Sequence, residues 1–280
     1  MSWKDVLAIV ADAEIDEPAI AVAGALAAKF DAAFSAAFLT PLPDEPLAYE
    51  PTVVAGVWAE LLGRARARAE QERGKIETRL KALARPAELR TAEALSRDLG
   101  RVAAVHARYA DIAVLTRPPE GAAGDLRAEL IEGILFYSGR AVLVAPPQPK
   151  AEAPGARIVV AWDASREATR ALSEAQPLLD RAERVFVVTV DAKPKTFGHG
   201  EQPGANIAAH LGRRGMAVEV RNVDGTGRTP AQAILDEALA VDADLIVLGG
   251  YTHSRLREMM FGGATRDLMR ASPLSLLMAH

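Results

Sequence analysis

Four glycines near the end of the chain have the clearest chemical potential. They lie in the stretch LIVLGGYTHSRLREMMFGGATRDLM, residues 245–269. Gly249 and Gly250 follow an apolar run of strand length, and Gly262 and Gly263 stand where the next helical pattern begins. Glycines let backbone N–H groups approach phosphate oxygens, and a helix N-terminus adds unpaired N–H groups and a positive dipole end. The spacing therefore fits a phosphate-binding loop.

The same loop carries polar side chains that suit an anion. The candidates are Thr252 and Thr265 for hydrogen bonds, His253 for a phosphate contact and Arg255 for charge. Each has an ordinary alternative, because solvated loop histidines and arginines are common, and glycines also serve turns and close helix–sheet contacts. The loop is not a Walker A motif, since no Gly-Lys-Ser/Thr follows, and its glycines are too far apart for the dinucleotide fingerprint.

These glycines need a parallel sheet to position them, and the second half of the chain predicts one. Strands are expected over 157–162, 184–190, 216–222, 244–249 and 273–278, and helices over 166–181, 204–214, 230–241 and 263–271. Strand runs such as RVFVVTV are apolar throughout, which is typical of a parallel sheet covered on both faces. In such sheets ligands bind beyond the carboxyl ends of the strands, where the strand order reverses.

The pattern occurs twice along the chain. YADIAVL pairs with DADLIVL at an offset of 133 residues, and the same offset pairs GRAVLVA with SPLSLLM at the end of each half. Four prolines in APPQPKAEAPGA indicate a semi-stiff linker without regular structure. We therefore expect two domains, 1–146 and 157–280, with a linker over 147–156. The equivalent apolar runs 141–145 and 274–278 are expected to pair across a pseudo-twofold axis, as an internal dimer.

The first half lacks the glycines at the matching positions. At the same offset, Glu129 stands opposite Gly262, and Pro118 and Pro119 follow the strand where the second half has Tyr251 and Thr252. Proline removes a backbone N–H donor, and a carboxylate repels a phosphate. We therefore expect the first half not to bind a nucleotide by this route and to serve as a packing partner.

The second half resembles the universal stress protein family. In that family the fourth strand is followed by Gly, two residues, Gly, nine residues, Gly and then Ser or Thr, in a loop that wraps the phosphates of ATP. Gly249 and Gly262 match the first and third glycines. Thr252 and Gly263 depart from the second glycine and from the hydroxyl residue, whereas Thr265 matches a further hydroxyl residue.

The resemblance implies two more binding residues outside this loop. Asp163 corresponds to an aspartate that meets the nucleotide at the end of the first strand, and Val190 to a valine whose backbone lies near adenine. An Asp in this position also caps the following helix, and the two roles are compatible. The glycine-rich loop 195–204 is expected either to border the pocket as a lid or to be surface decoration.

The resemblance covers residues 157–280 well, and covers 1–146 through the order of elements and the internal repeat. It implies an α/β fold of two tandem Rossmann-like (adenine nucleotide alpha hydrolase-like) domains. Each would be a mostly parallel five-stranded sheet with helices on both faces.

The implied function is that of a cytoplasmic stress-response protein that binds ATP, ADP or AMP in its second domain, with Mg²⁺ as an accompanying ion. No general base or metal-holding carboxylate pair is evident in the loop, so we expect a regulatory ligand with at most slow hydrolysis. The alternative is a member of the same fold that binds no nucleotide and acts as a protein-interaction scaffold. The departures at Thr252 and Gly263 favour this alternative.

The composition excludes several classes of protein. The 280 residues include no cysteine, so disulfides and thiolate metal sites are ruled out. Lys+Arg number 33 against 37 Asp+Glu, and this balance predicts no nucleic-acid partner. The acidic N-terminus is unlike a secretory leader, and the apolar run Ala19–Ala28 is too short to span a bilayer. We expect a cytoplasmic location, no membrane partner and self-association, either as the internal pseudo-dimer alone or with a further homodimer.

Overall fold

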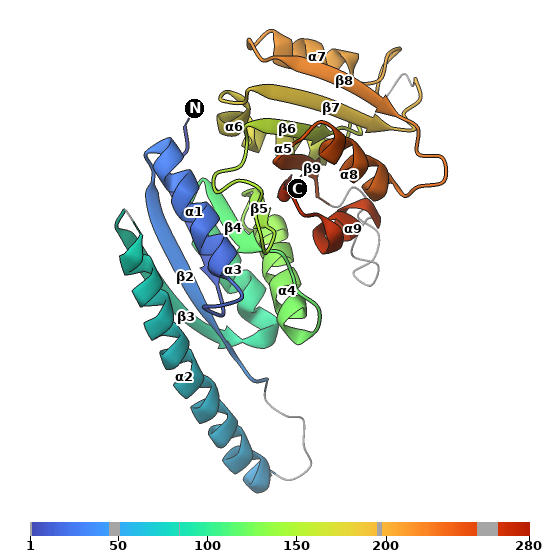
Figure 1. Cartoon of the computed structure of the whole chain (residues 1–280). Coiled ribbons are helices and arrows are strands. Elements are labelled where there is room, and N and C mark those ends of the chain that lie inside the picture. Colours follow the sequence, from blue (N-terminus) through green and yellow to red (C-terminus); the bar gives the residue numbers. More distant parts are fainter. Residues whose placement is uncertain (1, 45–50, 84, 195–197, 251–262) are drawn as a thin grey trace.

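One continuous sheet organises the molecule (Figure 1). The computed structural model describes residues 2–44, 51–83, 85–194, 198–250 and 263–280. Within them ten strands form a single sheet in the order β3-β2-β1-β4-β5-β10-β9-β6-β7-β8. Each half contributes five parallel strands, which confirms the predicted α/β architecture of two tandem five-stranded domains.

The elements follow the same order in both halves. The first half contains β1 (Asp5–Val10), α1 (Glu17–Phe30), β2 (Ala33–Leu42), α2 (Pro51–Ala82), β3 (Ala87–Leu95), the 3₁₀ turn η1 (Ser96–Asp98), α3 (Leu99–Ala107), β4 (Ile112–Thr116), α4 (Ala122–Tyr137) and β5 (Val142–Ala145). The second half contains β6 (Arg157–Ala161), α5 (Arg166–Glu174), α6 (Gln176–Leu179), β7 (Arg184–Val190), α7 (Ala205–Gly212), β8 (Val218–Val223), α8 (Pro230–Ala240), β9 (Leu245–Gly249), α9 (Gly263–Ala271) and β10 (Ser275–Ala279).

One predicted helix is interrupted. The helix expected over 166–181 is two helices, α5 and α6, which break at Ala175. Pro177 lies in the first turn of α6. It has no backbone N–H group, so it cannot donate the hydrogen bond that would continue helix α5. The helix 230–241 begins as expected, since Thr229 and Gln232 form a capping box and Pro230 occupies the first turn.

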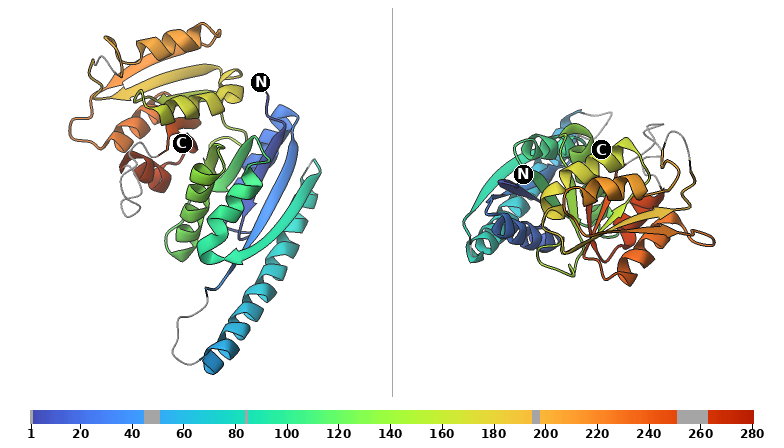
Figure 2. Two further views of the ribbon diagram at one scale, coloured as in Figure 1. Left: turned by 180° about the vertical axis from the view of Figure 1, so that it is seen from behind. Right: turned by 90° about the horizontal axis from the view of Figure 1, so that it is seen from above.

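Helices cover both faces of the sheet, as the views in Figure 2 show. Helices α1, α2, α5, α6 and α7 pack into one buried cluster, and α3, α4, α8 and α9 pack into another. Strand side chains alternate between the two, so Val6 and Val10 enter the first cluster while Leu7 and Ile9 enter the second. No helix in the described part of the chain is both long enough and apolar enough to cross a membrane.

The two halves meet edge to edge through β5 and β10. The pairing is antiparallel, with Leu276 opposite Val144 and Met278 opposite Val142, as the repeat predicted. The strands of the two halves therefore run in opposite directions. As a result, the carboxyl ends of the strands in the second half lie at the same edge of the sheet as the amino ends of the strands in the first half. The C-terminal end of α4 therefore lies beside Gly250, the residue that follows β9.

An aspartate at the same position of the repeat fixes the start of each half. Asp111 accepts hydrogen bonds from the N–H groups at the start of β1. Asp244 accepts hydrogen bonds from Gly155, Ala156 and Arg157 at 3.0, 3.0 and 3.3 Å, and only 7% of its surface is exposed. The linker has no helix or strand, but its last residues are held in place by Asp244.

Replacing Asp244 with alanine is expected to lower the free energy of unfolding by about 2 kcal/mol, because buried N–H groups lose their acceptor. Urea denaturation followed by circular dichroism measures the change. The matched control is Asp236→Ala on α8, which removes an exposed ion pair with Arg228 and should cost no more than about 0.5 kcal/mol. Equal effects of the two substitutions would contradict the role given to Asp244.

Candidate functional site

The candidate site lies at the carboxyl ends of β6 and β9. From β6 the chain continues into α5 on one face of the sheet, whereas α9 after β9 packs on the other face. The strand order reverses between them, and such a switch point is where open α/β sheets bind ligands. Ala161 pairs with Leu248, so Trp162 and Gly249 lie next to each other at this edge.

The loop that carries Asp163 has a fixed conformation. Asp163 is exposed, and its Oδ1 atom accepts a hydrogen bond from the N–H of Ser165 at 3.0 Å. Ser165 is the N-cap of α5 and accepts from the N–H of Ala168 at 3.0 Å, so Asp163 itself does not cap the helix. Between them Ala164 has a φ of 61°, a left-handed conformation that is costly for a residue with a Cβ. Backbone strain of this kind concentrates at functional sites.

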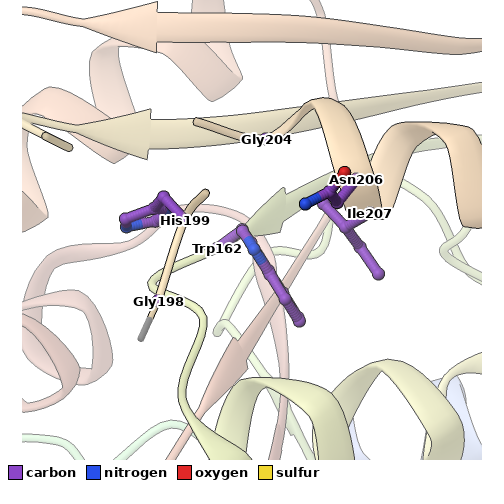
Figure 3. Close-up of a pocket in the computed structure, with 6 residues that line it drawn as sticks. All are labelled: Trp162, Gly198, His199, Gly204, Asn206 and Ile207. Atoms are coloured by element: carbon purple, nitrogen blue, oxygen red, sulfur yellow. The ribbon is translucent and has the colours of Figure 1, made fainter. Parts of the chain in front are cut away.

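A pocket of ≈ 190 Å³ opens beside this loop (Figure 3). It is lined by Trp162, Gly198, His199, Gly204, Asn206 and Ile207. Trp162 follows β6, and the other five residues come from the β7–α7 loop and the first turn of α7. In Figure 3 the indole of Trp162 stands between His199 on one side and Asn206 with Ile207 on the other. Gly198, His199 and Gly204 of the loop 195–204 therefore line a pocket, and a role of this loop as a lid stays a prediction.

The pocket contains a buried polar atom without a partner. The Nδ1 atom of His199 is buried and has no hydrogen-bond partner among the described residues. A buried polar atom is almost always hydrogen-bonded to protein, water or ligand. The side-chain amide of Asn206 borders the same space. The arrangement offers a flat aromatic surface and hydrogen-bonding groups to a planar heterocycle.

Val190 lies at the same edge but faces away from this pocket. It ends β7, and its side chain packs against the buried cluster on the α8 and α9 face. Trp162 packs on the opposite face, toward α7. The structure thus brings Val190 and Asp163 to one edge of the sheet, while the side chain of Val190 is not among those that line the pocket.

Gly249 has a packing role of its own. A Cβ atom placed on it would lie 2.6 Å from the backbone nitrogen of Ala168. The first turn of α5 can therefore pack this closely on β9 only because position 249 is a glycine. Gly250 donates to the carbonyl oxygen of Ala279 at 2.8 Å, and the Nδ1 atom of His280 lies 3.0 Å from the carbonyl oxygen of Gly250. Close helix–sheet contact, the alternative raised for these glycines, therefore explains Gly249.

Helix α9 begins at Gly263, as predicted from the sequence. Gly263 is exposed, and a Cβ atom placed on it would meet no heavy atom of the described residues within 4 Å. Thr265 is buried in the first turn of the same helix, with 6% of its surface exposed. The other predicted loop residues are Thr252, His253, Arg255 and Gly262, and they lie outside the residues that the structure describes.

The comparison with known proteins decides the family of this half. Residues 156–280 match the Universal stress protein family. The second half is a universal stress protein domain. No curated protein matches the sequence.

Solved structures extend the universal stress protein fold to the whole chain. A universal stress protein from Archaeoglobus fulgidus DSM 4304 superimposes over 98% of this chain and 95% of its own length, with a TM-score of 0.68 and 17% identity. A functionally unknown protein from Pseudomonas aeruginosa PAO1 covers 99% of this chain and 92% of its own, with a TM-score of 0.54 and 13% identity. The tandem arrangement predicted from the internal repeat is therefore confirmed at the level of the fold.

The matching edge of the first half is occupied by a buried ion pair. Arg127 of α4 donates from Nε and Nη2 to the two carboxylate oxygens of Asp16, at 2.7 Å each, and both side chains are only 3% exposed. Asp16 also accepts from the N–H groups of Ala11 and Asp12. The guanidinium thus binds the loop that follows β1, beside the switch point between β1 and β4. Sequence reasoning missed Arg127, although an arginine among the apolar residues of helix 122–137 was a signal for it.

Asp12, the counterpart of Asp163, is engaged by the protein itself. Burial raises the pKa of Asp12. Hydrogen bonds from the N–H groups of Ile15 and Glu14, together with the charges of Arg127 and Arg68, outweigh this effect, so the pKa of Asp12 lies below its ordinary value. The carboxylate is therefore stabilised in its charged form by groups of the first half. Among the described residues, its counterpart Asp163 accepts a single hydrogen bond, from the N–H of Ser165.

Proposed function

We propose that the chain is a cytoplasmic stress-response protein whose universal stress protein domain binds ATP or a related adenine nucleotide. The observation that carries the proposal is the pocket beside Asp163, with its unpartnered His199 Nδ1 atom. A space of ≈ 190 Å³ equals about six water molecules at ~30 Å³ each and is of the size that a heteroaromatic ring system requires. Trp162 would stack on the base, and His199 and Asn206 would supply hydrogen bonds to its edge.

The remaining parts of a nucleotide have suitable groups nearby. Asp163 follows Trp162 directly and has an exposed carboxylate that can accept from ribose hydroxyls. Gly249 ends the neighbouring strand β9, and Gly263 is the first residue of α9. Backbone N–H groups at the N-terminus of a helix favour phosphate. We assign the bound nucleotide a regulatory role, in which it stabilises one conformation of this edge and thereby changes contacts with partners.

Calorimetric titration with ATP, ADP and AMP in the presence of Mg²⁺ tests this function. His199→Ala is expected to weaken nucleotide binding about tenfold, or ~1.4 kcal/mol, because a hydrogen bond in the buried pocket is lost. The matched control is His210→Ala, an exposed histidine on α7 that does not line the pocket and should leave the affinity unchanged. Absence of binding by all three nucleotides at millimolar concentration would refute the proposal.

A protein-interaction scaffold without nucleotide is the second candidate function. It is favoured by the contact between Gly249 and α5, since this glycine is needed for packing whether or not a phosphate binds. A thermal shift assay separates the two candidates. A nucleotide ligand raises the unfolding temperature as its concentration rises, whereas a pure scaffold shows no such change.

A further inference from the structure

A cluster of aromatic and arginine side chains, exposed except for the half-buried Arg140, lies along α3 and at the C-terminal end of α4. This aromatic–arginine patch consists of Arg101, Val105, Arg108, Tyr109, Tyr137 and Arg140. The exposed fractions are 75% for Tyr109, 47% for Val105 and 45% for Tyr137. Single exposed apolar residues scattered over a surface are normal, but two exposed tyrosines and an exposed valine on neighbouring elements form a larger group.

Contacts between its members make the patch one surface. The guanidinium of Arg101 lies 5.4 Å from the centre of the Tyr137 ring. Arg108 donates from Nη2 and Nε to the carbonyl oxygen of Tyr137 at 2.9 and 3.2 Å, and Arg140 donates to the carbonyl oxygen of Arg108 at 3.5 Å. Arg101 and Arg108 thus contact one exposed tyrosine, Tyr137, and Arg140 is joined to them through Arg108.

The arginines of the patch carry charge that the described part of the chain does not neutralise. None of Arg101, Arg108 and Arg140 forms an ion pair there, whereas most arginines of α2 and Arg127 of α4 do. The carboxylates of α4 lie elsewhere: Glu129 feels the charges of Asp44 and Asp98, and Glu132 feels that of Arg266. Tyrosine and arginine are the residue types that dominate binding energy at protein interfaces.

The fold itself does not require these residue types. At the matching positions of the internal repeat the second half has Ile234, Ala238, Val241, Asp242, Arg270 and Pro273. That half forms the same helices and strands without the aromatic and arginine cluster. The patch is therefore a feature of the first half alone, whose own switch point is taken up by Arg127 and Asp16.

The patch also lies at the edge of the sheet that holds the candidate nucleotide site. Phe136, the neighbour of Tyr137, packs edge-on against His280 with ring centres 4.9 Å apart. His280 in turn contacts the carbonyl oxygen of Gly250. Two side chains, Phe136 and His280, therefore connect the patch to Gly250 at the end of β9.

We propose that the aromatic–arginine patch binds an acidic segment of a partner protein. Carboxylates of the segment would pair with Arg101 and Arg108, and an apolar side chain would pack on Tyr109 and Val105. A nucleic acid fits less well, because its binding is dominated by contacts of basic side chains with phosphates, and the patch has only three arginines on a chain of net charge −4. The inference does not depend on nucleotide binding by the second half.

Fluorescence anisotropy with the full chain tests the patch. The probe is a short fluorescein-labelled peptide rich in Glu and Phe, and its comparison is the same peptide with Gln in place of Glu. We expect saturable binding of the Glu peptide that weakens with salt, and little binding of the Gln peptide. Arg101→Glu is expected to weaken the affinity at least about tenfold, and Tyr109→Ala severalfold.

The matched control is Arg213→Glu, which makes the same change of net charge at an exposed position after α7. Circular dichroism of each variant checks that the fold is retained. The proposal is overturned if the Glu peptide does not bind, if Arg101→Glu and Arg213→Glu bind it equally, or if a single-stranded RNA of similar charge is bound in preference.

Discussion

Replacing Arg127 with methionine is expected to lower the free energy of unfolding by about 3–5 kcal/mol. The guanidinium makes two hydrogen bonds of 2.7 Å to Asp16, and both groups are almost fully buried. Methionine leaves the Asp16 carboxylate buried with backbone N–H donors as its remaining partners. Urea denaturation measures the loss, and the unfolding of the first half should shift to lower urea concentration.

An exposed ion pair provides the control for Arg127. Arg64 pairs with Glu60 on α2, with exposed fractions of 74% and 62%, and Arg64→Met should change stability by no more than about 0.5 kcal/mol. The double substitution Arg127→Met with Asp16→Leu removes both charges and should recover a substantial part of the loss. If Arg127→Met costs no more than Arg64→Met, the pair does not hold the edge of the first half together.

The ion pair gives a physical account of how the two halves differ. Both have the same order of strands and a switch point at the same place, and both have an aspartate two or three residues after the first strand. In the first half that loop is bound by Arg127 and by side chains of α2, among them Glu72, which accepts from the N–H of Ala13. In the second half the corresponding loop begins at Trp162, which lines a pocket. The switch point of the first half is filled by its own side chains, while that of the second half leaves space for a ligand.

The sequence was sufficient for the fold because its signals are local and repeated. Apolar runs of strand length, Ala-rich helical stretches and Thr229-Pro230 at a helix start each depend on a few neighbouring residues. The pairing of β5 with β10 followed from the equivalence of two terminal strands in the repeat, and it is confirmed. The interruption at Ala175 was missed because Pro177 lies within an otherwise helical pattern.

The candidate site was predictable only in part. Asp163 and Gly249 were placed correctly at one edge, since both directly follow apolar strands of a parallel sheet. The partnership of Trp162 with His199 was not foreseeable, because it joins residues from different loops with no fixed spacing. The salt bridge from Arg127 to Asp16 likewise spans 111 positions of the chain. Contacts of this kind depend on how helices are seated on the sheet, which periodicity does not specify.

Glycines illustrate the same limit, because Gly133 belongs to no sequence motif and is nevertheless predicted to tolerate no side chain. Substitution of Gly133 by alanine is expected to lower the free energy of unfolding by about 3 kcal/mol. A Cβ atom at this position would lie 2.3 Å from the carbonyl oxygen and 2.5 Å from the Cα atom of Gly100, where α3 and α4 cross. Both obstructing atoms belong to the backbone, so the helices must separate to relieve the clash.

The opposite result is expected for Gly74→Ala on α2. In the part of the chain that the structure describes, no heavy atom lies within 4 Å of a Cβ placed there. Alanine in a helix is favoured over glycine, so stability should rise by about 0.5–1 kcal/mol. Thermal and urea unfolding of the two variants measure both signs, and a shift in the same direction for both would contradict the packing argument.

The same two variants also differ in their expected effect on the aromatic–arginine patch. Arg101 lies next to Gly100, and Tyr137 lies one turn beyond Gly133. Separation of α3 from α4 in Gly133→Ala should therefore weaken binding of the acidic peptide, whereas Gly74→Ala should leave that binding unchanged.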